Sequence, residues 1–210
     1  MKVLIPLKGV LKRVPFIGVR FNLNICHMDY KLVFEQLLKS FHEKHVRYAL
    51  IGGFALGVQG VSRATTDIDF LVHRDDMPKV HVLLCELGYE RLYQSENVSQ
   101  YKSPLKILGA VDFLHAFREI SINMLQRAQE KKIFDETIAL KVVTVEDLIG
   151  LKVQAMANDK SRKSSELADI ESLLAEHRQS VDWGLLESFF SLFRLDELFD
   201  QLKNRYGHAE

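Results

Sequence analysis

The feature that most constrains this 210-residue chain is a pair of aspartates, Asp67 and Asp69, in an apolar segment. The residues from Asp67 to Val72 have the composition of a buried strand, and side chains two positions apart on a strand share a face. Both carboxylates are therefore expected to point the same way from a core strand. Like charges held this close are costly unless a cation neutralises them, and a hard, oxygen-liganded ion such as Mg²⁺ is the usual solution.

A glycine pair, Gly52 and Gly53, lies upstream of the aspartates. It follows an apolar segment, 47–51, that reads as a first core strand, and it precedes a short predicted helix, 54–58. Such a turn offers bare backbone N–H groups to a phosphate, although the same pair can simply form a tight turn. A carboxylate metal platform beside a phosphate-binding turn predicts nucleotide chemistry.

The segment from Ile51 to Val72 resembles the signature of the DNA polymerase β-like nucleotidyltransferase superfamily. That signature is a Gly-Gly or Gly-Ser turn, about a dozen residues, and then D-x-D between apolar residues. Within it, Arg63-x-Thr65-x-Asp67-Ile68-Asp69-Phe70 is most similar to the bacterial abortive-infection (AbiEii-type) nucleotidyltransferase toxins. The resemblance covers roughly Tyr30 to Leu174. It implies an α/β (α+β) nucleotidyltransferase fold, with helices packed on one face of a small mixed sheet and a helical C-terminal tail.

The resemblance also implies further site residues. It calls for a third acid on a neighbouring strand, which Asp112 supplies between apolar residues. The toxin branch implies a lysine on a following helix and an aspartate about one helix later, and Lys152 and Asp169 fit those positions. The alternatives are a surface lysine whose stem covers apolar neighbours and a plain helix-surface acid. The chain departs from the branch at Ser165-Glu166, where a basic residue followed by Asp is usual.

Three polar residues before the aspartate pair are candidate nucleotide contacts. We expect Arg63 to contact the triphosphate and the hydroxyls of Thr65 and Thr66 to lie near phosphate. A solvated loop charge and loop-capping hydroxyls are the alternatives. His115 comes three positions after Asp112, so its side chain should face away, and we interpret it as structural.

These residues together predict nucleotidyl transfer. An NTP would place its triphosphate on the glycine turn, Asp67 and Asp69 would hold Mg²⁺, and Asp112 would complete a two-ion site and help to activate the acceptor hydroxyl. The toxin resemblance implies a tRNA 3′ end or a protein hydroxyl as acceptor, and an antitoxin protein as partner. A small-molecule acceptor, as in antibiotic-modifying enzymes, is an alternative. So is a catalytically idle module that binds a nucleotide or a partner protein.

Composition limits the setting of this chemistry. An apolar content of 47% can build a core, and the 28 basic and 28 acidic residues cancel. This balance argues against binding nucleic acid through the overall field, but it allows a local basic groove. Cys26 and Cys85 give no disulfide framework, and Cys85 is expected in the core. His73 and His81 match no zinc spacing. A cytoplasmic location is expected, and no apolar run reaches the length of a membrane span.

The chain divides into three predicted regions: a basic and apolar N-terminal extension (1–27), a nucleotidyltransferase core (28–143) and a helical C-terminal region (144–210). The extension could stem from an upstream start codon, or could be a basic arm that docks on the protein or on RNA. Aromatic residues in the tail recur at helical spacing and are expected to pack in a core. The remaining periodicity predicts helices over 29–44, 75–87, 120–129, 148–157, 166–176, 183–193 and 195–202, strands over 109–114 and 138–143, and an edge strand or hairpin over 89–102.

Overall fold

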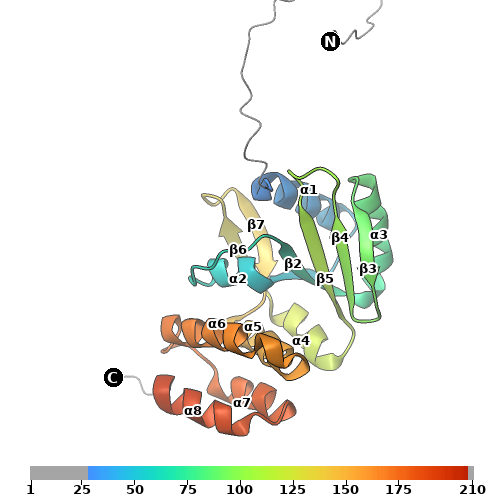
Figure 1. Cartoon of the computed structure of the whole chain (residues 1–210). Coiled ribbons are helices and arrows are strands. Elements are labelled where there is room, and N and C mark those ends of the chain that lie inside the picture. The colour runs from blue at the N-terminus through green and yellow to red at the C-terminus, as the bar shows by residue number, and fades with distance from the viewer. Residues whose placement is uncertain (1–27, 208–210) are drawn as a thin grey trace, which may run out of the picture.

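The computed structural model describes residues 28–207, so the predicted extension, residues 1–27, lies outside the described part of the chain (Figure 1). The described residues form a seven-stranded sheet in the order β3-β4-β5-β2-β1-β7-β6. The pairs β1–β7 and β2–β5 are parallel and the other neighbours are antiparallel. The predicted α/β class with a small mixed sheet is therefore confirmed. Among residues 28–207, no helix combines the length and apolarity that crossing a bilayer requires.

The elements follow the predicted order closely. The strands are β1 (Tyr48–Ile51), β2 (Ile68–His73), β3 (Glu90–Gln94), β4 (Val98–Lys102), β5 (Ala110–Ala116), β6 (Gln129–Ile133) and β7 (Ile138–Val142). The helices are α1 (Tyr30–Glu43), α2 (Gly52–Val58), α3 (Met77–Glu86), α4 (Glu119–Arg127), α5 (Val145–Asn158), α6 (Lys163–Glu176), α7 (Trp183–Leu192) and α8 (Asp196–Tyr206), with 3₁₀ turns at Arg74–Asp76 and Lys160–Arg162.

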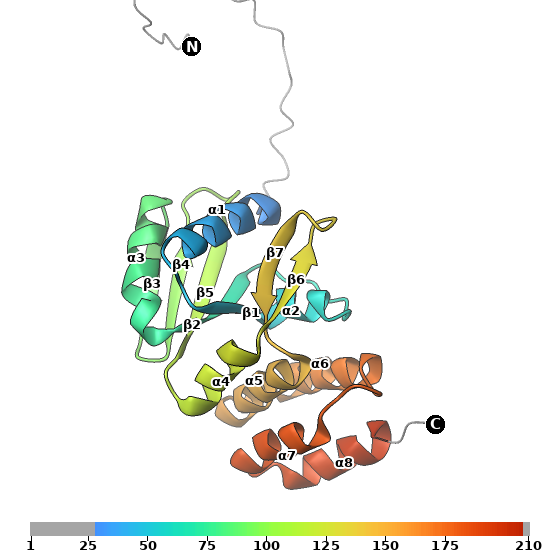
Figure 2. The same ribbon diagram turned by 180° about the vertical axis from the view of Figure 1, so that it is seen from behind.

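Helices α1 and α3 cover one face of the sheet (Figure 2). Phe41 of α1 contacts Phe70 of β2 edge-on at 5.4 Å between ring centroids, and Phe70 stacks on Phe113 of β5 at 5.9 Å. Such aromatic pairs contribute about 0.5–1.5 kcal/mol each beyond the area they bury. Phe70 and Phe113 each follow an aspartate directly, and neighbouring side chains on a strand point to opposite faces, so the two aspartates lie on the face opposite these rings.

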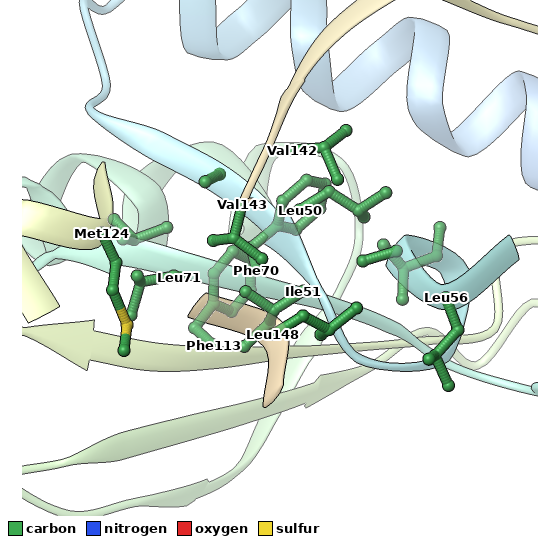
Figure 3. Close-up of a cluster of buried hydrophobic side chains, with 14 of the residues drawn as sticks. Leu50, Ile51, Leu56, Phe70, Leu71, Phe113, Met124, Val142, Val143 and Leu148 are labelled. Carbon is green, nitrogen blue, oxygen red and sulfur yellow. The ribbon is translucent and has the colours of Figure 1, made fainter. Parts of the chain in front are cut away.

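The opposite face is only partly covered. Leu71 lies beside Met124 of α4 and Leu148 of α5 in the apolar cluster of Figure 3. Over β4 this face is open, since Gln100 and Lys102 are exposed while their neighbours Ser99 and Tyr101 are buried. Helices thus pack on both faces, and not on one alone as the resemblance implied.

The C-terminal helices form two further layers beyond the sheet. In both views, α5 and α6 lie between the sheet and the α7–α8 pair (Figures 1 and 2). Phe189 packs so closely on Gly150 that a Cβ there would lie 2.8 Å from its ring. Phe190 and Phe199 are also buried and their rings meet at 5.7 Å. These contacts confirm that tail aromatics build a core.

Three sequence-based expectations need adjustment. Segment 89–102 is a hairpin, β3–β4, which decides between the two alternatives. Strand β6 was not predicted, because Gln129-Glu130-Lys131-Lys132 lacks apolar alternation. It is a charged edge strand, and β7 is its only partner in the described part of the chain. Cys85 is exposed rather than in the core, because α3 turns Leu83 and Leu84 to the sheet instead.

Candidate active site

The two central acids lie side by side on parallel strands. Asp69 of β2 is the register partner of Asp112 of β5. Because paired positions on neighbouring strands share a face, both side chains leave the sheet on the side away from α1 and α3. The structure thus brings together two of the three predicted acids, which are 43 residues apart by their numbering in the chain.

Burial and like charge both act on Asp69. Burial, together with the negative charges of Asp112 and Asp67, raises the pKa of Asp69 to about 6. A hydrogen bond from the backbone of Gly53 and the positive charge of Lys152 oppose this rise. The carboxylate is therefore held in a site where its negative charge is incompletely neutralised.

Asp112 has a partner that the sequence analysis missed. Gln100 is its register partner on β4, and its side-chain amide donates a 2.8 Å hydrogen bond to Oδ2 of Asp112. Burial raises the pKa of Asp112, the bond from Gln100 lowers it, and the charge of Asp67 raises it. The alternation of side chains along β4 could have shown that Gln100 and Lys102 share a face. It could not have shown that Gln100 lies opposite Asp112, because the register between β4 and β5 is a tertiary property.

The prediction that Asp67 lies in the second strand is wrong. It is exposed and occupies a bend directly before β2. The β1 ladder ends at the Ile51–Asp69 pair, since the chain turns into α2 at Gly52, and the β5 ladder begins at Ile68. Asp67 therefore has no partner strand among residues 28–207. Its backbone carbonyl instead accepts a 3.2 Å hydrogen bond from the Thr65 hydroxyl.

The glycine pair is packed against the acid-bearing segment. Gly52 has a φ of +69°, and a Cβ on it would lie 2.0 Å from Oδ2 of Asp69. A Cβ on Gly53 would lie 2.7 Å from the Thr65 side chain. Both positions thus exclude a side chain, and Gly52 also adopts a backbone conformation that L residues rarely take.

Thr65 and Thr66 differ in their surroundings. The backbone carbonyl of Thr65 accepts a 2.9 Å hydrogen bond from the Tyr30 hydroxyl, which ties the segment to α1. Thr66 is exposed and lines a surface cleft together with Asp67. The two hydroxyls therefore do not form one binding unit.

Lys152 is buried, which excludes the surface-lysine alternative. Its ammonium donates to Oδ2 of Asp169 at 2.6 Å and to Oε2 of Glu166 at 3.0 Å, and the residue is 6% exposed. Asp169 is also buried, so it is not a plain surface acid. Burial raises the pKa of Glu166, but the bonds and charges of Lys152 and Arg162 outweigh it, so the net pKa is lowered.

Arg63 joins this buried network from the other side. Its guanidinium pairs with Oδ2 of Asp169, the oxygen that Lys152 also contacts. The network therefore links the loop before β2 to helices α5 and α6. Glu166, the residue at which the chain departs from the toxin pattern, is a member of it and was not among the predicted site residues.

His115 is structural in its contacts. Its Nδ1 lies 2.9 Å from the carbonyl of Glu96 and its Nε2 lies 2.9 Å from the Ser99 hydroxyl. This matches an imidazole that donates from Nδ1 and accepts at Nε2. Its buried position faces away from Asp112, as the odd spacing predicted.

The donor set suits a hard cation in its chemistry. Asp69 and Asp112 are neighbouring carboxylates whose charges raise the pKa of Asp69, and no lysine or arginine of residues 28–207 pairs directly with either. Oxygen ligands of this kind are what Mg²⁺ prefers. Within residues 28–207, no three His, Cys, Asp or Glu side chains lie close enough together to form a complete metal site. The register and charge therefore fit a metal, while its ligands remain a prediction.

This fold and site define a class: a mixed sheet that presents aspartates on two adjacent parallel strands, beside a glycine turn, is the arrangement expected of a nucleotidyltransferase. The family comparison agrees. Residues 29–201 match the family model described as "Uncharacterised nucleotidyltransferase", and the chain belongs to that family of nucleotidyl-transferring enzymes. No curated protein sequence matches the chain.

Solved structures share the fold at low sequence identity. The antibiotic-resistance factor ANT(2'')-Ia superposes with a TM-score of 0.58 and 13% identity, over 85% of this chain and 97% of that one. The lincosamide antibiotic adenylyltransferase LnuA, solved with lincomycin bound, gives 0.51 and 16%, over 70% and 97%. An antigenic nucleotidyltransferase-like protein from Paracoccidioides brasiliensis gives 0.50 and 18%, over 82% and 91%. These likenesses support the nucleotidyltransferase fold and leave the AbiEii-type branch as a proposal.

Proposed function

We propose that this protein is a Mg²⁺-dependent nucleotidyltransferase that moves an NMP from an NTP to an acceptor hydroxyl. The observation that carries the proposal is the register of Asp69 and Asp112 on adjacent parallel strands. Clustered acids are costly to keep in a fold that only binds, which argues against an idle module. Residues 28–143 would be the catalytic core, and 144–210 a helical region that supplies Lys152 and Asp169.

Nucleotide binding would use the segment from the glycine turn to Asp67. Because Gly52 and Gly53 lack side chains, Asp69 and Thr65 pack directly against the turn. The backbone N–H groups of the turn would bind the triphosphate next to the acid. Lys152 and Arg63 share one carboxylate oxygen of Asp169, and Lys152 and Arg162 pair with Glu166. The three cations exceed the two carboxylates by one charge, which leaves positive charge available to phosphate. Thr66 would add a hydroxyl. In this arrangement Asp169 and Glu166 orient the three cations.

The transfer step follows from the acid pair. The acceptor oxygen forms a bond to the α-phosphorus as the bond from that phosphorus to the bridging oxygen breaks, and pyrophosphate leaves. The acceptor proton passes to the carboxylate of Asp112, whose raised pKa makes it a better base than an ordinary aspartate. Asp67, Asp69 and Asp112 would hold Mg²⁺, which would neutralise charge on the phosphates.

The preferred acceptor is a hydroxyl of a macromolecule, a tRNA 3′ end or a protein, in keeping with the toxin resemblance of the segment 63–70. A toxin of this type would be paired with an antitoxin protein. A small-molecule acceptor is the second candidate. It is favoured by the structural likeness to ANT(2'')-Ia and LnuA, whose chains are covered to 97%.

The test is to incubate the protein with each NTP in labelled form, Mg²⁺ and total cell extract. We expect label from at least one NTP to enter RNA or protein, with release of pyrophosphate, and neither with Asp69→Asn. Label in a small molecule would establish the second candidate. A folded wild-type protein that binds NTP but transfers none under any of these conditions would support the idle module.

A further inference from the structure

A cleft of about 530 Å³ opens beside Asp67 on the uncovered face of the sheet. Besides Asp67 and Thr66, its lining includes Lys102 of β4, Lys106 of the following loop and Glu90 of β3. The volume lies in the range of small-molecule and cofactor sites. Because the cleft adjoins an acid of the candidate active site, a molecule bound in it can present a group to that site.

One wall of the cleft is held firmly in place. The loop of residues 103–109, which carries Lys106, is closed by a 2.9 Å hydrogen bond from the Ser103 amide to the Gly109 carbonyl. The Tyr89 hydroxyl donates to the Leu108 carbonyl at 2.8 Å, and the Asp29 amide donates to the Ile107 carbonyl at 2.8 Å. Lys106 therefore projects from a loop that both the β3 side and the start of α1 support.

The charge of the lining points to the chemistry of the occupant. The charged lining residues are Lys102, Lys106, Glu90 and Asp67, and their four charges cancel. Once Asp67 binds the proposed Mg²⁺, the other three residues leave one net positive charge. Neither lysine takes part in an ion pair within residues 28–207. The chain as a whole is neutral, so this excess is local. A polycationic acceptor would meet repulsion here, whereas a phosphate group would meet two unpaired ammonium groups.

We infer that this cleft is the acceptor site and that Lys102 and Lys106 select an acceptor that carries phosphate. The inference rests on the proposed function, since the acceptor is defined by the transfer reaction. The acceptor's phosphate would lie against the two lysines while its hydroxyl reaches the edge of the cleft at Asp67. Exposed apolar area at Leu92 supports the uncharged part of the molecule, because this side chain lines the cleft and is 64% exposed.

Direct binding tests this inference without requiring turnover. The probes are a fluorescent single-stranded RNA oligonucleotide and a nucleoside monophosphate, which separate a strand from a small phosphate, and an aminoglycoside as a polycation. We expect Lys102→Ala/Lys106→Ala to weaken binding of a phosphate probe at least tenfold while NTP affinity stays unchanged. For the oligonucleotide, the slope of log K against log salt should fall by about 1.4, the value for two phosphate contacts on a single strand.

Two control variants complete the design. Lys39→Ala/Lys44→Ala removes the same charge from exposed positions on or next to α1, outside the cleft lining, and should bind like wild type. Lys102→Arg/Lys106→Arg keeps the charge and should restore most of the affinity. Equal losses in both alanine variants, unchanged binding in Lys102→Ala/Lys106→Ala, or tight binding of the aminoglycoside alone would overturn the inference. Failure of the proposed function would instead appear as no NTP binding or no pyrophosphate release by the wild-type protein, and neither result depends on the phosphate probes.

Discussion

Asp69 and Asp112 lie side by side on adjacent parallel strands, and both side chains leave the same face of the sheet. Within the described residues, no lysine or arginine pairs directly with either carboxylate. A fold keeps such an arrangement at a cost in stability, because each charge disfavours ionisation of the other. The cost is relieved when a cation binds. Stability, metal affinity and turnover are therefore linked at this pair, and each can be measured separately.

Asp69→Asn should abolish transfer and stabilise the metal-free protein at neutral pH. The folded-state pKa of about 6 lies above the ordinary value of 3.8, so the folded protein binds more protons between these values and wild-type stability falls as pH rises through that window. The asparagine lacks this loss, which is on the order of 1–3 kcal/mol. Thermal melts from pH 4 to pH 8 without metal will check it. If the melting temperatures of the two proteins changed with pH in the same way, the raised pKa would be contradicted.

Gln100→Leu should shift the pH dependence of the reaction. The amide of Gln100 lowers the pKa of Asp112, so its removal should raise that pKa and move the acidic limb of the kcat/KM profile to higher pH. Gln94→Leu changes an exposed glutamine on β3 and should leave the profile in place. An unshifted limb in Gln100→Leu would mean that Asp112 is not the titrating base.

Lys152→Ala should destabilise the protein, because it removes the buried cation that the Glu166 and Asp169 carboxylates share. Arg162 and Arg63 still pair with these carboxylates, so the loss should stay below the roughly 3–5 kcal/mol of an uncompensated buried charge. The triple variant Lys152→Met/Glu166→Gln/Asp169→Asn removes the three buried charges, leaves the partly exposed Arg63 and Arg162, and should recover most of that loss in urea unfolding. If Lys152 contacts the triphosphate, the triple variant should still turn over at least tenfold more slowly than wild type. Full activity in it would confine the site to the glycine turn and the three acids.

Gly52→Ala should impair both folding and catalysis. Its Cβ would meet Asp69 at 2.0 Å and its φ of +69° is strained for alanine, so we expect about 2 kcal/mol of lost stability and a large loss of turnover. Gly57→Ala is the matched control in the same helix, because nothing lies within 4 Å of its Cβ. It should gain about 0.5–1 kcal/mol and keep full activity.

Gly53→Val tests the phosphate contact separately. The added side chain would press on Thr65, because even a Cβ at position 53 would lie 2.7 Å from the Thr65 side chain. It would also occupy the approach of the phosphate to the backbone. We expect the NTP dissociation constant, measured by calorimetry, to rise at least tenfold. A folded Gly53→Val protein with wild-type affinity would show that phosphate binds elsewhere.

Local sequence patterns predicted most elements of the fold. Apolar runs around Asp69 and Asp112 predicted core strands correctly, because most of the positions that flank the two aspartates are buried. The start of α5 is also set locally, since the Thr144 hydroxyl accepts a hydrogen bond from the Asp147 amide at 3.3 Å, as helix N-caps do. Strand β6 escaped prediction because an edge strand gains its structure from pairing with β7 and not from burial.

The sequence by itself determined which residue types stand close together along the chain: the glycine pair, the Asp67–Asp69 pair and the apolar positions that bury their strand. The tertiary structure alone decided that Gln100 bonds Asp112, that Asp67 leaves the ladder, and that Lys152 is buried between Glu166 and Asp169. The physical reason is that spacing sets the direction of a side chain within one element. Register between strands and packing between helices depend on free energies summed over the whole core, and no local pattern contains them.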